Sequence, residues 1–146
     1  MSIALDTNVI VNVVSGTPQV GELVASLLRE HGGRSRLVIS PVVYAELFAH
    51  PGWKPDDLLA FLGATAVAVD WDLPASVWTR AGDAFVQYAR RRRRLGAGSA
   101  PRRLLADFVV GAHAVESGAL MTSDMGFFRK NFPELQIIAV PATARS

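Results

Sequence analysis

Short apolar runs alternate with amphipathic segments along almost the whole chain. The first run, Ile3-Ala4-Leu5, ends at a carboxylate, Asp6, and a second apolar run at 9–11 predicts the start of a helix. Between residues 18 and 31 apolar positions recur at helical spacing, and Gly32-Gly33 supplies the stop. Further strands are predicted at 37–39, 66–69, 119–122 and 135–140, and further helices at 42–49, 56–62, 74–94, 102–117 and 125–130.

The order of these elements predicts the fold class. Short, wholly apolar strands that alternate with helices indicate a parallel sheet, because helical crossovers cover both of its faces. We therefore expect an α/β fold with a short central parallel sheet flanked by helices on both faces. The stretch at 95–101 is rich in Gly, Ala and Ser and predicts a loop, and residues 141–146 predict a frayed tail. With no internal repeat, residues 1–146 are predicted to form a single domain.

The composition supports one globular core and excludes several kinds of chemistry. Half of the 146 residues are hydrophobic and 19% are charged, which is the opposite of the composition that keeps chains unfolded. The chain has no cysteine, so disulfides, thiolate metal sites and cysteine nucleophiles are excluded. No basic leader precedes an apolar run, and the longest apolar stretch, near 58–69, is too short to span a bilayer. We expect a cytoplasmic protein without membrane contact.

Charge is distributed unevenly between the two halves of the chain. Residues 1–73 have a net charge of −4 and residues 74–146 a net charge of +6, which together give the overall +2. The basic excess is concentrated in one stretch without acidic residues, formed by Arg90, Arg91, Arg92, Arg93, Arg94, Arg102 and Arg103. This arginine run is consistent with contacts to nucleic-acid phosphates, and equally with a solvated helix end whose cations suit the helix dipole.

Four acidic residues stand in apolar surroundings. Asp6 and Asp124 follow predicted strands, and Glu46 and Asp107 lie within apolar helical segments. An unpaired buried carboxylate destabilises a fold, so a compensating cation is expected, and Arg103 is the only cation one turn from Asp107. Mg²⁺ and Mn²⁺ prefer carboxylate oxygens, whereas a zinc site would need thiols or paired histidines that the sequence lacks. The set predicts a magnesium or manganese site.

Each member of this set also has a structural interpretation. Asp6 and Asp124 could cap the helices that follow them, and a single acid in a helix such as Glu46 or Asp107 is more often solvated than catalytic. Four small polar residues adjoin the two strand-end acids and could cap helices or hold water at a metal: Thr7, Asn8, Thr122 and Ser123.

These residues resemble the PIN-domain nucleases over nearly the whole chain. The similarity rests on Leu5-Asp6-Thr7-Asn8-Val9-Ile10, Glu46-Leu47, Ala106-Asp107, and Thr122-Ser123-Asp124 before Phe127-Phe128. The size and the motif order are similar to those of VapC-type toxins of toxin–antitoxin pairs. The resemblance implies a Mg²⁺- or Mn²⁺-dependent ribonuclease that uses Asp6, Glu46, Asp107 and Asp124, with a polar helper near Thr7 or Asn8 and Thr122 or Ser123. It also implies a homodimer and a cognate antitoxin.

The sequence departs from the family pattern at two positions. Many relatives have a further acid shortly after the last aspartate, where this chain has Gly126, and His113 is not part of the general motif. We assign His113 a role in helix packing or in supporting a neighbouring residue, without a catalytic part.

The main hypothesis is therefore a metal-dependent endoribonuclease that hydrolyses RNA phosphodiester bonds as the toxin of a toxin–antitoxin pair. One alternative is a Mg²⁺-dependent phosphohydrolase acting on a small substrate, although Asn8 stands where such enzymes place a second aspartate. The other is a PIN-like module that binds RNA or protein without turnover. Trp53 and Trp78 are predicted either to form part of a partner or dimer surface or to pack in the core.

Overall fold

Five parallel strands form the centre of the molecule. In this computed structural model, which describes residues 1–96 and 103–142, the sheet has the order β3-β2-β1-β4-β5. Every neighbouring pair of these strands is parallel, as the alternation of strands and helices predicts. The strands are β1 (Ser2–Leu5), β2 (Arg36–Ile39), β3 (Ala68–Val69), β4 (Gly118–Thr122) and β5 (Gln136–Ala139).

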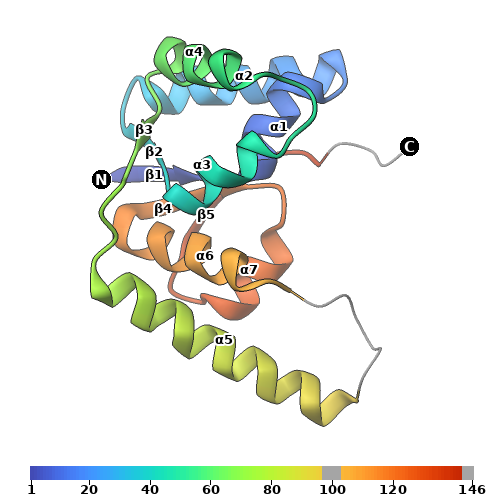
Figure 1. Ribbon diagram of the computed structural model, residues 1–146, viewed down its shortest axis with the longest axis vertical. Helices are drawn as coiled ribbons and strands as arrows, with labels where there is room; N and C mark the ends of the chain where they lie inside the picture. The colour runs from blue at the N-terminus through green and yellow to red at the C-terminus, as the bar shows by residue number, and fades with distance from the viewer. Residues whose placement is uncertain (97–102, 143–146) are drawn as a thin grey trace.

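Helices cover both faces of this sheet. The right-handed crossover rule places the helices between β1 and β3 on one face and those after β3 on the other. Figure 1 shows this division, with α1, α2 and α4 above the sheet and α5, α6 and α7 below it. The helices are α1 (Thr7–Ser15), α2 (Pro18–Gly32), α3 (Pro41–Phe48), α4 (Pro55–Thr65), α5 (Ala75–Leu95), α6 (Leu105–Ser117) and α7 (Met125–Asn131).

Local sequence signals set where the helices begin. Asp6, Thr17 and Ser40 each accept a hydrogen bond from a backbone N–H in the first turn of α1, α2 and α3. Pro18 and Pro41 follow two of these caps at the first helical position, where the missing N–H costs nothing. The caps hold the chain at the carboxyl ends of β1 and β2, so the residues just after these strands have fixed positions.

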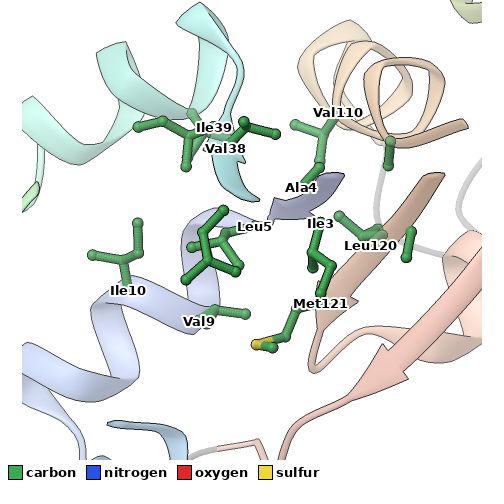
Figure 2. Close-up of a cluster of buried hydrophobic side chains, with 14 of the residues drawn as sticks. Ile3, Ala4, Leu5, Val9, Ile10, Val38, Ile39, Val110, Leu120 and Met121 are labelled. Atoms are coloured by element: carbon green, nitrogen blue, oxygen red, sulfur yellow. The ribbon is translucent and has the colours of Figure 1, made fainter. Parts of the chain in front are cut away.

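The core is centred on β1, the middle strand. In the register of the sheet Ala4 lies opposite both Val38 of β2 and Leu120 of β4. All three side chains are almost wholly buried. Figure 2 shows Ala4 on the side of the sheet that faces Val110 of α6, and Leu5 on the opposite side with Val9 of α1. Burying a side chain of the size of Leu120 stabilises the fold by about 2 kcal/mol. The polar residues that follow β1 and β4 are therefore attached to the buried centre of the sheet.

Several predicted boundaries and side-chain positions are wrong in detail. The helix predicted at 102–117 begins at Leu105, and Arg102 lies outside the described residues, as do 97–101 and 143–146 of the predicted loop and tail. The strand predicted from residue 66 begins at Ala68, because Ala66 adopts a left-handed conformation that ends α4. Of the tail, Pro141 is held by a hydrogen bond from the Asn12 amide to its carbonyl (3.2 Å).

The two tryptophans have different environments. Of the two interpretations of Trp78, packing in the core is wrong, because its side chain is 51% exposed. The buried residues of α5 are Val77, Ala81 and Ala84. Trp53 is partly buried, and its indole N–H donates to the Leu47 carbonyl at 2.7 Å. No helix within residues 1–96 and 103–142 has the length and the apolar composition needed to cross a membrane.

Candidate active site

Asp6 lies directly after β1, beside the point where the strand order of the sheet reverses. Its Oδ1 accepts the Thr7 backbone N–H at 2.8 Å. Its Oδ2 accepts the Thr122 hydroxyl at 2.8 Å and the Asn8 amide at 3.0 Å. The sequence left open whether Asp6 caps a helix or joins an acidic site. The structure shows that it caps α1, and that it also lies within electrostatic reach of Asp107 and Glu46.

Glu46 comes from α3 and meets the start of α1. Its Oε1 accepts the Thr7 hydroxyl at 2.9 Å, so the backbone N–H of Thr7 holds Asp6 while its side chain holds Glu46. Loss of hydration raises the pKa of Glu46, the negative charge of Asp107 raises it further, and the Thr7 hydrogen bond opposes both. Thr7 is thus the residue that ties two acids from distant parts of the sequence together.

Asp107 lies in the first turn of α6. Its Oδ2 accepts the backbone N–H of Leu104 at 3.3 Å, which fixes the carboxylate at the start of the helix. Burial raises the pKa of Asp107 and the charge of Asp124 adds to this rise, whereas the Leu104 hydrogen bond and the positive charge of Arg103 lower it. A favourable position at a helix N-terminus therefore does not fully offset the crowding of negative charge.

Asp124 directly precedes α7 but does not cap it. Its side chain makes no capping hydrogen bond, which corrects the interpretation of this residue as a helix cap. Its Oδ2 instead pairs with Nη1 of Arg103 at 2.8 Å, and its backbone N–H donates to the Thr122 hydroxyl at 3.0 Å. The sequence indicated Arg103 as a neighbour of Asp107 in the helix, and only the tertiary structure shows that its ion pair is with Asp124.

The polar residues beside the strand ends orient the acids and join the two segments. Asn8 donates its amide to Asp6 and accepts the Ser123 backbone N–H at 3.2 Å. Thr122, which is wholly buried, donates to Asp6 and accepts from Asp124. Three of the four predicted helpers therefore act through their side chains, while the contact of Ser123 is made by its backbone.

The four acids form one electrostatically linked group, which we call the acidic cluster: Asp6, Glu46, Asp107 and Asp124. Burial raises the pKa of Asp6 from 3.8 to about 6, and the charges of Asp107 and Glu46 contribute to the rise, against the hydrogen bonds from Thr122 and Thr7. Asp107 in turn acts on Glu46, and Asp124 acts on Asp107. Elements far apart in the sequence thus concentrate negative charge at the carboxyl edge of the sheet.

The donor chemistry of the acidic cluster fits a hard divalent cation, because all of its candidate ligand atoms are carboxylate oxygens. Burial, together with the charge of neighbouring acids, raises the pKa of Asp6, Glu46 and Asp107. The side chains are not closed around a single point. Within the described ranges, no three Asp, Glu or His side chains lie close enough together to hold one metal ion. Protein donors occupy oxygens of these acids instead, so closing on a cation requires side chains to turn.

The arginine run separates into held and exposed members. Nη2 of Arg91 donates to Oδ1 of Asn131 at 2.5 Å, and the guanidinium of Arg92 lies 5.9 Å from the ring centre of Tyr88. Arg90, Arg93 and Arg94 are exposed at the end of α5. A cavity of about 600 Å³ adjoins this end of the helix and is lined by Phe85, Tyr88, Ala89, Arg92, Arg93, Gly96 and Arg103.

His113 has a partner that the sequence did not reveal. Its Nε2 lies 2.9 Å from Oδ2 of Asp70, and Oδ1 of the same aspartate lies 3.5 Å from Nη1 of Arg36. The position of Asp70 at a strand end predicts an ordinary solvated acid, and this prediction is wrong, because α6 packs His113 against it. The pair makes His113 a packing residue of α6, as expected for a histidine outside the family motif.

Similar solved structures agree with this architecture over nearly the whole chain. VapBC2 from Rickettsia felis bound to a DNA fragment from their promoter matches with a TM-score of 0.70 and 21% identity, covering 96% of this chain and 99% of that chain. VapBC-1 from nontypeable Haemophilus influenzae matches with a TM-score of 0.62 and 20% identity, covering 95% and 98%. DNA-bound VapBC from Salmonella typhimurium matches with a TM-score of 0.59 and 20% identity, covering 95% of this chain and 98% of that chain.

These likenesses establish the fold. No curated protein matches the chain. A family model described as PIN domain matches residues 3–133, a range that contains every member of the acidic cluster and the elements that position them. The chain therefore belongs to the PIN domain family.

Proposed function

We propose that this protein is a divalent-metal-dependent endoribonuclease and the toxin of a toxin–antitoxin pair. The observation that carries the proposal is the acidic cluster, in which a PIN domain gathers four carboxylates at the switch point of its sheet and burial and neighbouring charge raise the pKa of three of them. A fold retains such a group at a cost in stability, and a nuclease that binds a cation gives a reason to retain it.

Asp6, Glu46, Asp107 and Asp124 are the residues that would hold Mg²⁺ or Mn²⁺. When bound, the ion supplies Lewis-acid chemistry that activates water and offsets the negative charge developing on the phosphodiester. The hydroxyl of Thr7 orients Glu46, and Thr122 and Asn8 orient Asp6. In the hydrolysis, a P–O bond forms to the water oxygen and the P–O bond to one ribose oxygen breaks, and that ribose oxygen leaves with a proton.

The RNA would approach across the cationic end of α5. Arg90, Arg93 and Arg94 are exposed there and can contact phosphates, whereas Arg91 is held by Asn131. Because the acidic cluster repels a polyanion, a bound cation and the substrate should favour each other's binding.

The similar structures also suggest a partner protein. All three are VapBC proteins, which supports a cognate antitoxin as a partner of this chain. We further propose a homodimer that acts in the cytoplasm, as the resemblance to VapC-type toxins implies.

The deciding experiment is cleavage of a mixed cellular RNA pool by the purified protein. We expect discrete RNA fragments with Mn²⁺ or Mg²⁺ and none with chelator. Asp107→Asn should reduce the cleavage rate more than substitution of a residue that only supports a metal ligand, which typically lowers activity by roughly 10- to 100-fold. Asp83→Asn, at an exposed position on α5, is the matched control and should cleave normally.

Two results would count against the proposal. Cleavage that persists in the presence of chelator would rule out a metal requirement. Hydrolysis of a small phosphate ester without RNA cleavage would favour the phosphohydrolase alternative. A folded protein that binds RNA but cleaves nothing under any condition would favour the non-catalytic module.

A further inference from the structure

Arg103 is held in place at three points. Its backbone N–H donates to the hydroxyl of Tyr88 at 2.6 Å, and its guanidinium carbon lies 4.5 Å from the ring centre of Phe127. Its Nη1 forms the 2.8 Å ion pair with Oδ2 of Asp124. One contact fixes the main chain, one fixes the plane of the guanidinium group, and the third directs its charge onto the acidic cluster.

The anchors of Arg103 belong to the hydrophobic core. The rings of Tyr88 and Phe127 both lie 5.2 Å from the ring of Phe108, which is fully buried and follows Asp107 in the sequence. Helices α5, α6 and α7 each contribute one of these rings, so their packing decides where Arg103 lies. The position of this arginine beside Asp124 is therefore built into the fold.

The ion pair uses a carboxylate that the proposed metal site also needs. The side chains of Arg103 and Asp124 are 38% and 35% exposed, so the pair is open enough to exchange its partner. The carboxylate of Asp124 does not cap α7, which leaves the guanidinium as its described partner. A guanidinium and a divalent cation at one carboxylate repel each other. The N–H groups of the guanidinium also compete for the carboxylate oxygen that a cation would bind.

We propose that Arg103 is a built-in competitor of the metal ion at Asp124, and that it raises the metal concentration at which the acidic cluster fills. The inference rests on the metal site of the proposed function but not on RNA cleavage. Metal entry exchanges the Arg103–Asp124 pair for a cation–carboxylate contact, and metal loss restores the pair. The activity of the protein would thereby depend on the supply of divalent cation as well as on any partner.

Direct measurement of Mn²⁺ binding tests this exchange without an activity assay. Free Mn²⁺ is counted by its electron paramagnetic resonance signal in titrations of the full chain, at one pH and one ionic strength. We expect Arg103→Gln to bind Mn²⁺ about fivefold more tightly than the natural chain, which is the scale of a partly exposed ion pair. Arg94→Gln removes the same charge from the exposed end of α5 and should change the affinity far less.

A conservative variant keeps the result interpretable if Arg103→Gln folds poorly. Arg103→Lys retains the charge but loses the planar fork and the stacking on Phe127, so its affinity should fall between those of the natural chain and Arg103→Gln. Circular dichroism of all variants checks that they are folded.

The outcomes separate this inference from the proposed function. Equal affinity in the natural chain and Arg103→Gln, or equal gains in Arg103→Gln and Arg94→Gln, would overturn the competition and leave the metal site standing. Weaker binding in Arg103→Gln would also overturn it, because Arg103 would then position Asp124 for the metal. No Mn²⁺ binding by any variant would overturn both the competition and the metal site.

Discussion

Asp6 and Asp70 stand at equivalent places in the fold and have opposite environments. Each directly follows a short parallel strand, β1 in one case and β3 in the other. Asp70 lies between Arg36 at 3.5 Å and His113 at 2.9 Å, so one acid has two nitrogen partners. Asp6 has neutral donors around it and two further acids within electrostatic reach, and its pKa rises to about 6.

The contrast teaches that the same local pattern can serve stability or chemistry. The charge of Asp70 is satisfied locally by groups that hold α6 and β2 to the end of β3. Burial and the charges of Asp107 and Glu46 raise the pKa of Asp6, and its hydrogen-bond donors Thr122 and Asn8 orient the carboxylate without supplying a positive charge. On the proposed function, an acid that costs stability is kept because a cation binds it, whereas a paired acid such as Asp70 is kept because it joins elements of the fold.

The largest expected effect concerns the pH dependence of stability in metal-free protein. Since the pKa of Asp6 is about 6 in the folded state and near 3.8 when unfolded, the folded state binds a proton more tightly. The resulting stability is fully present below about pH 4 and is lost as the pH rises through 6. The free energy of unfolding should fall by up to about 3 kcal/mol across this window. Denaturant unfolding at a series of pH values measures it.

Substitution of Asp6 assigns the effect. Asp6→Asn should remove most of the loss of stability above pH 5. The smaller rises in the pKa of Glu46 and Asp107 change stability in the same direction and remain in this variant. Added Mn²⁺ should restore stability to the natural chain at pH 7.5, because it binds only the folded state, and should restore less to Asp6→Asn. A natural chain whose stability rises steadily from pH 4 to 7 would contradict the contrast between the two aspartates.

The second prediction concerns Asp70, the aspartate that has two nitrogen partners. Asp70→Ala leaves the imidazole of His113, which is only 4% exposed, without its carboxylate partner, and should lower the free energy of unfolding by about 1–3 kcal/mol. Asp70→Asn should cost less, since an amide oxygen can still accept a hydrogen bond. Asp72→Ala, at an exposed position two residues away, is the control and should stay within about 0.5 kcal/mol.

Activity distinguishes the two aspartates further. Folded Asp70→Ala should cleave RNA as well as the natural chain, because its network lies apart from the acidic cluster. Loss of cleavage without loss of stability would place Asp70 in the catalytic machinery and end the contrast.

The smallest effect concerns positive charge at the exposed end of α5, which has no role in the packing of either aspartate. Replacing Arg90, Arg93 and Arg94 by Gln should leave stability almost unchanged and should reduce the salt dependence of RNA binding. If all three contact phosphates of single-stranded RNA, the slope of log affinity against log salt falls by about 2. Filter binding of an inactive Asp107→Asn background at several salt concentrations measures the slope, and an unchanged slope would assign these arginines to solubility alone.

Much of the architecture was predictable because it depends on local patterns. Apolar runs such as Ile3-Ala4-Leu5 can only be buried strands in a chain that alternates them with amphipathic helices, and Ser40-Pro41 marks a helix start by its own chemistry. The α/β class, the parallel sheet and nearly every element follow from such signals. The sequence left open whether Trp78 is buried or exposed, because several apolar stripes fit one amphipathic helix and only tertiary packing selects among them.

The order of residues along the chain is enough to identify the candidates for chemistry, since burying an acid inside an apolar segment is costly wherever that segment lies in the fold. It could not determine their partners, because ion pairs and hydrogen bonds join residues far apart in the chain. The folded arrangement sets three such contacts: Thr7 with Glu46, Arg103 with Asp124, and His113 with Asp70. The physical reason is that electrostatic energy depends on distances in space, which the packing of helices on the sheet sets.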